Sequence, residues 1–383
     1  MMTSDTNACK CWPLATHYFF YFTLLGAILP YLGLYLSSLE FSPAQIGELM
    51  AAFLLTKIVA PNIWGALADR NQRSVFWVRL AIFLALVLST GLIVFDQYWS
   101  LFSLLLAFSF FWHAALPQFE SFTFKSLGAQ KHKYGQLRLW GSVGFIASVM
   151  ALGALFDVVA ISILPWILTG LLLILWLTTW LFKDLTIKAD TQSDSEGFRK
   201  ILYRPEVMAL LWVSFLVQLS HGVYYSFFTI QMTALGWSAT AIAWLWSLGV
   251  VAEIAVFWWM ASLFQRFAVR NLILIAICLT FVRWLITGYA DDSLVALLFA
   301  QTLHAASFGL FHAAAIHLID QYFTGRHHGK GQALFAASSH GLGGSVGMLT
   351  AGYTWQVGAA PLSYTVMAAS ALLAGLIAYR WIR

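Results

Sequence analysis

The chain has 383 residues, of which 61% are hydrophobic and only 10% are charged, and its mean hydropathy is +0.78. Soluble domains have about 25% charged residues, so this composition excludes a soluble enzyme, a disordered protein and a nucleic-acid-binding protein with a basic surface. The long apolar runs also exclude an outer-membrane barrel, whose strands alternate over short segments. The composition therefore predicts an all-α integral membrane protein.

Turn and cap residues divide the chain into twelve apolar segments, each about long enough to span a bilayer as a helix. The predicted spans are 14–37, 44–67, 75–95, 99–124, 137–157, 161–182, 206–231, 238–263, 269–289, 293–319, 331–353 and 362–381. The first segment is too long for the apolar core of a typical secretory signal, so we expect a retained first helix.

The basic residues predict an orientation for these spans. Nineteen of the 21 Lys and Arg residues fall at the amino terminus, in loops after even-numbered helices or at the carboxyl end, and the opposite loops carry none. Basic loops stay in the cytoplasm, so we expect both termini on the cytoplasmic side of a bacterial inner membrane. The net charge of +5 is then explained by the orientation of the spans, with contact to anionic lipid as a side effect. We therefore expect no nucleic-acid partner.

The chain divides into two parts that carry faint repeats of each other. The polar stretch 183–205 predicts a cytoplasmic linker between six-helix bundles at 1–182 and 206–383. GSVG occurs at 141–144 and again at 344–347, and HAA at 113–115 and again at 304–306. Duplicated halves with a site between them near the middle of the membrane are a transporter architecture.

The run GALADRNQR at 65–73 follows the second predicted span and resembles the loop signature of the major facilitator superfamily. Asn71-Gln72 departs from the commonest form of that signature. The resemblance implies a glycine that allows close helix approach and charges that latch the two halves on the cytoplasmic side. The residues that match these roles are Gly65, Asp69, Arg70 and Arg73.

A finer resemblance covers nearly the whole chain. TKIVAPNIWGALADR, YGQLRLWGSVGF and QTLHAASFGLFHAA resemble the phenylpropionate permease group, which is related to lactose permease and to nucleoside proton symporters. The resemblance implies the major facilitator fold, with twelve transmembrane helices in two pseudo-symmetric bundles. It also implies proton-coupled transport of a small organic solute.

Ionisable residues inside a bilayer are costly and are functional candidates by default. Glu253 lies in the middle of the eighth predicted helix and Arg283 in the middle of the ninth, and a short loop joins the two helices. We expect the two side chains to meet as a proton-linked ion pair. A permanent structural salt bridge is the alternative, although buried pairs contribute little stability on their own.

Histidines and aromatic residues mark one face each of the seventh and tenth helices. His304 and His312 are eight positions apart, about 80° around a helix, with Phe308 between them. His221, Tyr224 and Tyr225 follow helical spacing on the seventh helix. We expect these faces to line a cavity, where His304 or His312 assists proton transfer. His221, Tyr224 and Gln301 would donate or accept hydrogen bonds to the solute. The alternative is ordinary hydrogen bonding between helices.

Two further sets of residues are substrate-binding candidates. Lys57 lies mid-span in the second helix and, with Arg283, would attract a carboxylate, whose aromatic ring could stack on Tyr21 or Tyr31. Glu120 and Arg138 form a second possible pair, and the resemblance to lactose permease implies a sugar-binding role for them. A latch at the membrane interface is the alternative for that pair.

The sequence thus predicts a proton-coupled symporter that works by alternating access, with an aromatic carboxylate such as 3-phenylpropionate as its best substrate. A sugar or nucleoside symporter is the alternative within the class. A membrane enzyme is a poorer interpretation, since no nucleophile or clustered His/Asp motif is present. A channel is also a poorer one, because channels are usually smaller repeated subunits rather than a duplicated twelve-span chain. We expect no cofactor and no metal site, and a monomer whose partners are the solute, protons and the bilayer.

Overall fold

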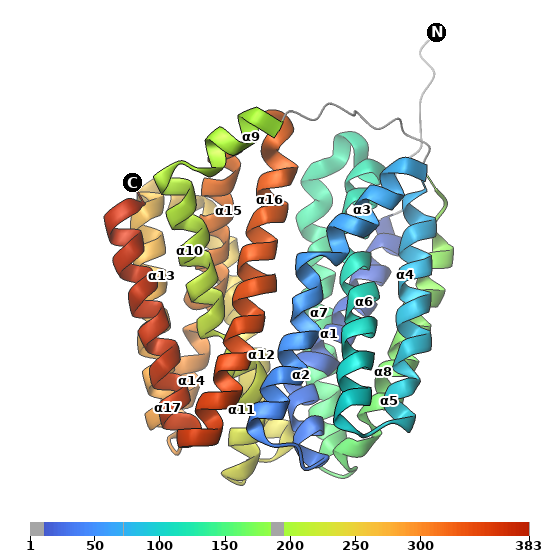
Figure 1. The fold of residues 1–383 in the computed structure, drawn as a ribbon, viewed down its shortest axis with the longest axis vertical. Coiled ribbons are helices and arrows are strands. Elements are labelled where there is room, and N and C mark those ends of the chain that lie inside the picture. The colour runs from blue at the N-terminus through green and yellow to red at the C-terminus, as the bar shows by residue number, and fades with distance from the viewer. Residues whose placement is uncertain (1–10, 72, 185–194, 383) are drawn as a thin grey trace.

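The structure is a computed structural model that describes residues 11–71, 73–184 and 195–382, which fold into helices joined by short turns (Figure 1). The helices are α1 (Cys11–Ser38), α2 (Pro43–Leu55), α3 (Ala60–Asn71), α4 (Ser74–Ser89), α5 (Gly91–Val94), α6 (Tyr98–Leu127), α7 (Tyr134–Phe156), α8 (Leu164–Thr178), α9 (Ser195–Leu202), α10 (Pro205–Ser220), α11 (Gly222–Ala234), α12 (Ala239–Arg266), α13 (Val269–Tyr289), α14 (Leu294–Thr302), α15 (Phe311–Tyr322), α16 (His328–Ala336) and α17 (Gly344–Trp381).

Twelve membrane crossings account for these helices. Ten helical stretches in the described residues are long and apolar enough to span a bilayer, but two of them, Tyr98–Phe156 and His328–Trp381, have 59 and 54 residues. Each would extend about 80–90 Å, far beyond the roughly 30 Å of a hydrocarbon core. Gly128 (φ +50°) interrupts the first stretch and Ala359 (φ +49°) interrupts the second. Each stretch is therefore two crossings, and the predicted twelve-helix fold is confirmed.

Five crossings are not continuous helices, a detail that the sequence interpretation did not include. Thr90 separates α4 from α5 in the third crossing. A 3₁₀ turn at Thr56–Ile58 divides the second crossing, and His221 separates α10 from α11 in the seventh. Wider π-helical turns interrupt the tenth crossing at Ala305–Leu310 and the eleventh at Ala337–Gly343. Such irregular turns are frequent at functional sites.

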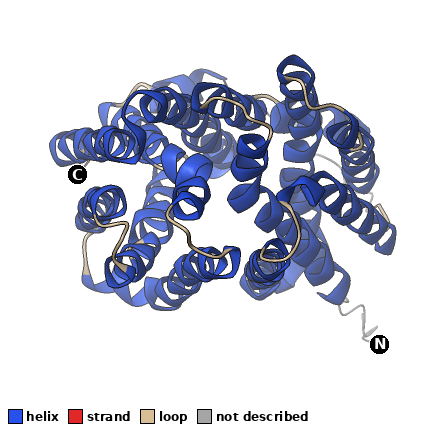
Figure 2. Ribbon diagram, turned by 90° about the horizontal axis from the view of Figure 1, so that it is seen from below, coloured by secondary structure: helices blue, strands red, loops and turns tan. Residues whose placement is uncertain are grey.

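Twelve crossings return the chain to the side on which it starts. We call this side the terminal end and the opposite side the far end. In Figure 1 the helices before residue 183 lie to the right and those after residue 205 to the left, and Figure 2 shows the two groups from the far end. Part of the predicted linker is helical, because α9 occupies Ser195–Leu202, whereas 185–194 lies outside the described residues. The domain boundaries at 182 and 206 stay a prediction.

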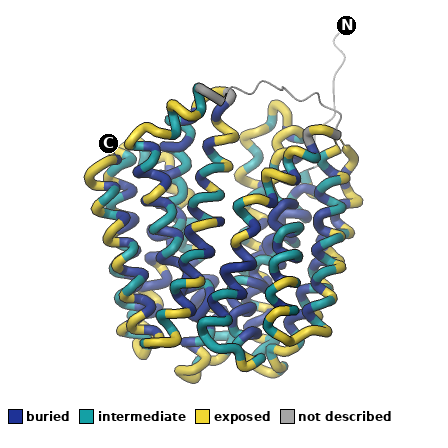
Figure 3. The backbone as a smooth tube through the Cα atoms, viewed as in Figure 1, coloured by how far each residue is buried: buried dark blue, intermediate teal, exposed yellow. Residues whose placement is uncertain are grey.

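The two groups of helices are held together at the far end. A Cβ atom on Gly47 of α2 would lie 2.7 Å from the Cα atom of Gly352 on α17, so these helices cross at backbone contact. The Tyr353 hydroxyl donates to Glu48 across the same boundary over 2.6 Å. Glu48 also accepts from Tyr98 of its own half. Buried backbone runs through the middle of the molecule in Figure 3, and exposed backbone follows the outer faces and the loops.

Asp157 adds a second link between the groups at the far end. It follows α7, and its carboxylate accepts the backbone N–H groups of Ala239 (2.6 Å) and Thr240 (3.2 Å) in the first turn of α12. A carboxylate is favourable at this position because the first N–H groups of a helix have no partner within the helix. The far end is therefore closed by both glycine packing and charge.

Candidate functional site

Three ionisable side chains, Glu253, His304 and Arg283, form a row through the interior of the second half. His304 lies at the end of α14, with its Nε2 atom 3.7 Å from the Glu253 carboxylate of α12. On the other side of the ring, Nη1 of Arg283 on α13 donates to Nδ1 of His304 over 3.0 Å. Three helices thus each contribute one member of the row.

The hydrogen bond from Arg283 determines which ring nitrogen of His304 carries the proton. A guanidinium group only donates hydrogen bonds, so Nδ1 of His304 must accept from Arg283. The ring proton of neutral His304 is therefore on Nε2, which faces Glu253. This arrangement can pass a proton between a carboxylate and an imidazole.

The expected direct pair between Glu253 and Arg283 does not form, and His304 lies between them instead. The correction has a packing cause. A Cβ atom on Gly309 would lie 2.9 Å from Cγ of Glu253, and one on Gly249 would lie 3.3 Å from the His304 ring. Gly249 on α12 and Gly309 on the π-helical turn let these two elements approach closely. His304 then fills the space between the Glu253 carboxylate and the Arg283 guanidinium.

Arg283 is fully buried and has several further partners. Its guanidinium donates to the Ser307 hydroxyl over 2.9 Å and to Oε1 of Gln301 over 3.5 Å. The same Gln301 oxygen accepts from the Tyr224 hydroxyl over 3.0 Å, and the Tyr224 ring lies 4.4 Å from the guanidinium carbon. The structure thus brings three predicted residues, His304, Gln301 and Tyr224, to one buried positive charge.

A column of rings extends from this charge along the tenth crossing. His304, Phe308 and His312 are nearly parallel, with neighbouring ring centroids 5.5 and 5.9 Å apart. His221 lies beside the column, 6.3 Å from Phe308, and stacks on Tyr225 at 5.9 Å. The helical spacing of these residues therefore does place them on one face.

Sequence reasoning missed His340. Its ring lies 5.6 Å from that of His312 and 6.2 Å from that of Phe308, on the π-helical turn of the eleventh crossing. The repeat GSVG at 344–347 follows it closely, within the run GLGGSVG that begins at Gly341. The available signal was a histidine next to that run inside an apolar span.

Lys57 lies on the 3₁₀ turn Thr56–Ile58 of the second crossing, which faces the eleventh crossing that carries His340. A Cβ atom on Gly341 would lie 2.7 Å from Cγ1 of Ile58, so the two irregular turns are in contact. Among the described residues, no carboxylate forms an ion pair with Lys57. Lys57 and His340 therefore each lie next to a residue of this contact between the first and second halves. Within the described residues, no carboxylate balances the charge of the lysine.

Three buried polar atoms near Arg283 have no hydrogen-bond partner within the described part of the chain. They are Nε2 of His221, Nε2 of Gln301 and Nε of Arg283. Nδ1 of His221 bonds to the carbonyl oxygen of Val217 over 2.8 Å and must donate there, so its Nε2 is a free acceptor. Because buried polar groups are nearly always paired, these atoms are candidates for contact with a polar solute.

The predicted pair in the first half forms, but in a different setting. Nε of Arg138 on α7 lies 3.8 Å from Glu120 on α6, and the two side chains are 37% and 32% exposed. The Tyr134 hydroxyl donates to Glu120 over 3.2 Å, and the Arg138 guanidinium lies 4.0 Å from the Phe22 ring centroid.

Two predicted aromatic candidates are engaged elsewhere. Tyr21 is buried, stacks on Trp112 at 5.3 Å and donates to its carbonyl oxygen. Tyr31 is buried and donates to the carbonyl oxygen of Val149 over 2.7 Å. Neither hydroxyl contacts the side chains of Glu253, His304 or Arg283. The expected role of these two tyrosines in stacking on the substrate ring therefore gains no support.

The loop signature is only partly described. A Cβ atom on Gly65 would lie 3.2 Å from the Gln118 side chain, which agrees with close helix approach. Arg70 and Arg73 are exposed at the terminal end, whereas the Asp69 side chain lies outside the described residues. In the described part of the chain, no cluster of three or more His, Cys, Asp or Glu residues could hold a metal ion.

Twelve crossings in two groups, with ionisable side chains buried in the second group, are typical of a multi-pass membrane transporter. Residues 11–366 match the family described as "MFS_1 like family", and the chain therefore belongs to this family of major facilitator superfamily transporters and is not an enzyme.

Named relatives and solved structures agree with this family. The chain is 30% identical to the "Probable 3-phenylpropionic acid transporter" of Escherichia coli (strain K12), over 90% of each chain. It is 26% identical to the "Maltose permease" of Geobacillus stearothermophilus, over 91% of this chain and 89% of that one. The crystal structure of nucleoside transporter NupG has a TM-score of 0.84 at 17% identity, and covers 97% of this chain and 98% of that one.

Proposed function

We propose that this transporter is a proton-coupled symporter of a small aromatic carboxylate such as 3-phenylpropionate. The observation that carries the proposal is the contact of Glu253 with His304, which Arg283 holds from its other side. A carboxylate next to an imidazole of fixed orientation can bind and release a proton. Protonation of Glu253 removes a costly charge from the membrane interior, and this change would permit reorientation of the loaded carrier.

The substrate carboxylate would bind between two cations. Arg283 retains an unpaired Nε donor, and Lys57 has no described carboxylate partner. His221 and Gln301 offer one acceptor and one donor, and Phe308 and Tyr225 offer rings for an aromatic group. The 30% identity to a relative named for 3-phenylpropionic acid supports this substrate class.

Transport would proceed by alternating access between the two halves, in a monomer in the bacterial inner membrane with the terminal end in the cytoplasm. The basic loops at that end support this orientation. The glycine crossing at Gly47 and Gly352 closes the far end in the described conformation. Opening this crossing while the terminal end closes would expose the site to the other side.

A sugar or nucleoside symporter is the second candidate. The Glu120–Arg138 pair favours it, because a half-exposed carboxylate and guanidinium can bind hydroxyl groups. The relative named maltose permease adds support for this alternative.

Counterflow in proteoliposomes separates the two candidates. We expect labelled 3-phenylpropionate to exchange, and maltose and uridine not to exchange. Glu253→Gln should abolish accumulation driven by a pH gradient and leave exchange intact, with Glu120→Gln as the matched carboxylate control. Exchange of the neutral solutes alone would refute the aromatic carboxylate, and gradient-driven accumulation by Glu253→Gln would refute the proton role.

A further inference from the structure

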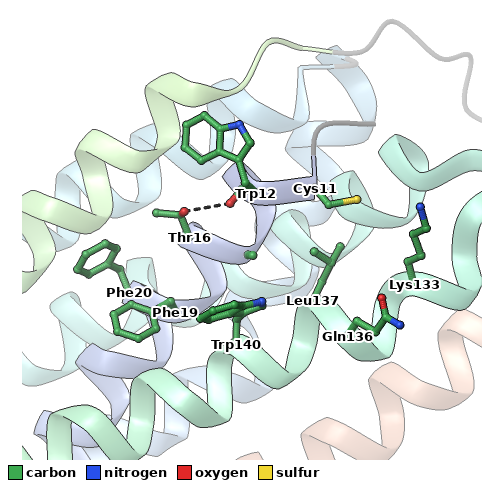
Figure 4. A pocket seen from close by; sticks show the side chains of 10 residues that line it. Cys11, Trp12, Thr16, Phe19, Phe20, Lys133, Gln136, Leu137 and Trp140 are labelled. Carbon is green, nitrogen blue, oxygen red and sulfur yellow. Dashed lines mark hydrogen bonds between the residues drawn. The ribbon is translucent and has the colours of Figure 1, made fainter. Parts of the chain in front are cut away.

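A groove lies outside the candidate site, between the first turns of α1 and the start of α7. Its volume is about 570 Å³, and most of its lining is aromatic or aliphatic. Figure 4 shows Trp12, Phe19 and Phe20 of α1, with Trp140 of α7 beside Phe19 and with Lys133 on the opposite side of the view. The groove is at the terminal end, at the level where the apolar spans meet the loops.

The groove opens away from the transport path. Arg138 of α7 points toward Phe22 and Glu120, which marks the face turned to the interior. Gln136 and Trp140 are each two positions from Arg138, about 200° around the helix, and therefore point to the opposite face. Trp12 and Trp140 are 59% and 51% exposed there. In a membrane, this face meets lipid.

The chemistry of the groove is graded along the membrane normal. Phe19, Phe20 and Trp140 lie about two turns into α1 and α7, whereas Lys133 directly precedes α7 and Gln136 lies in its first turn. Within the described part of the chain, no carboxylate pairs with Lys133. Lys131 and His132 precede it in the same exposed turn. An apolar cleft beneath an unpaired ammonium group complements a molecule with a hydrocarbon chain and a negative headgroup.

We propose that this groove binds one anionic phospholipid of the leaflet at the terminal end. Its phosphate contacts Lys133 and the Gln136 amide, and one acyl chain lies between the rings of α1 and α7. Tryptophans at this depth fit the belt that aromatic residues form at membrane interfaces. The groove differs from an ordinary belt because it is concave and carries a basic residue at its rim.

Photo-crosslinking in nanodiscs tests this proposal. The full chain is reconstituted with phosphatidylcholine and a small fraction of either phosphatidylglycerol or phosphatidylcholine carrying a diazirine in one acyl chain. We expect the anionic probe to label the peptides that contain Trp12–Phe20 and Lys133–Trp140 preferentially. Lys133→Gln should reduce this labelling about fivefold, which corresponds to roughly 1 kcal/mol per basic residue near a membrane surface. Lys133→Arg should preserve it.

Lys125→Gln is the matched control, because Lys125 is an exposed lysine at the same end of the neighbouring helix α6. It should leave labelling of the groove unchanged. Equal labelling by the zwitterionic probe, or unchanged labelling in Lys133→Gln, would overturn the proposal. Competition by soluble glycerol phosphate would also overturn it, because the ligand would then be a free phosphate. Trp140→Leu should weaken labelling by both probes, and unchanged labelling in this variant would contradict a chain-binding groove.

Discussion

The sequence HAA places a histidine at matching positions of the two halves, His113 in the fourth crossing and His304 in the tenth. Their surroundings differ. Nδ1 of His113 lies 2.9 Å from the Thr56 hydroxyl, which donates to Ser109 over 3.0 Å, so this histidine ties two helices together with neutral groups. His304 instead bridges Arg283 and Glu253. The comparison teaches that a repeated motif can serve packing in one half and charge transfer in the other.

The largest expected effect comes from Arg283→Lys. A lysine ammonium is a point charge and cannot keep the forked contacts to His304, Ser307 and Gln301. Unsatisfied buried groups cost about 1–3 kcal/mol each, so we expect a loss of about 10–100-fold in initial uptake rate. Arg138→Lys in the half-exposed first-half pair is the control and should lose less than about fivefold. Equal losses of uptake rate in the two variants would contradict the proposal that the buried charge of the second half matters more than the half-exposed pair of the first.

The histidine pair itself gives the second test. His304→Gln breaks the link from Glu253 to Arg283, so solute exchange should continue while accumulation driven by a pH gradient fails. His113→Gln should keep accumulation coupled and lower the free energy of unfolding by about 1–3 kcal/mol, since the Thr56 contact is buried. Proton uptake measured with a pH-sensitive dye separates the two variants. Uncoupling by His113→Gln would contradict its structural role.

A smaller effect is expected for Glu120→Gln. Its partner Arg138 is partly exposed, and exposed ion pairs contribute about 1 kcal/mol or less. Thermal unfolding should therefore change little, and the KM for 3-phenylpropionate should stay within about threefold of its original value. A KM increase for maltose or uridine uptake would instead favour the sugar or nucleoside alternative and assign substrate binding to the first half.

The smallest effect concerns pH at the far end. The Thr240 side chain, with the backbone N–H groups of Ala239 and Thr240, lowers the pKa of Asp157 below its usual value of about 4. A lowered pKa in the folded state means that this contact contributes fully above the unfolded value and is lost as pH falls through the folded value. The distance between spin labels on the far ends of α7 and α12 should thus be constant from about pH 8 to pH 5. Separation within that range would refute this assignment, and Asp157→Asn should remove the response at lower pH.

The number of crossings could be predicted from sequence because the length of an apolar run and its flanking turn residues are local properties. The fold class followed for the same reason, and the HAA repeat indicated duplication. The spacing of His304, Phe308 and His312 was sufficient to predict that they share one face. Their ring stack runs through the π-helical turn at Ala305–Leu310, which regular helical periodicity does not predict. Lys57, Glu253 and Arg283 were found because charges are rare in apolar spans.

Only the tertiary structure decided how these residues combine. His304 separates Glu253 from Arg283 because Gly249 and Gly309 let α12 approach a π-helical turn. His340 enters the same group through the turn at Ala337–Gly343, and Lys57 meets that turn through Ile58. These contacts join helices from distant parts of the chain, and a sequence read one helix at a time does not contain them.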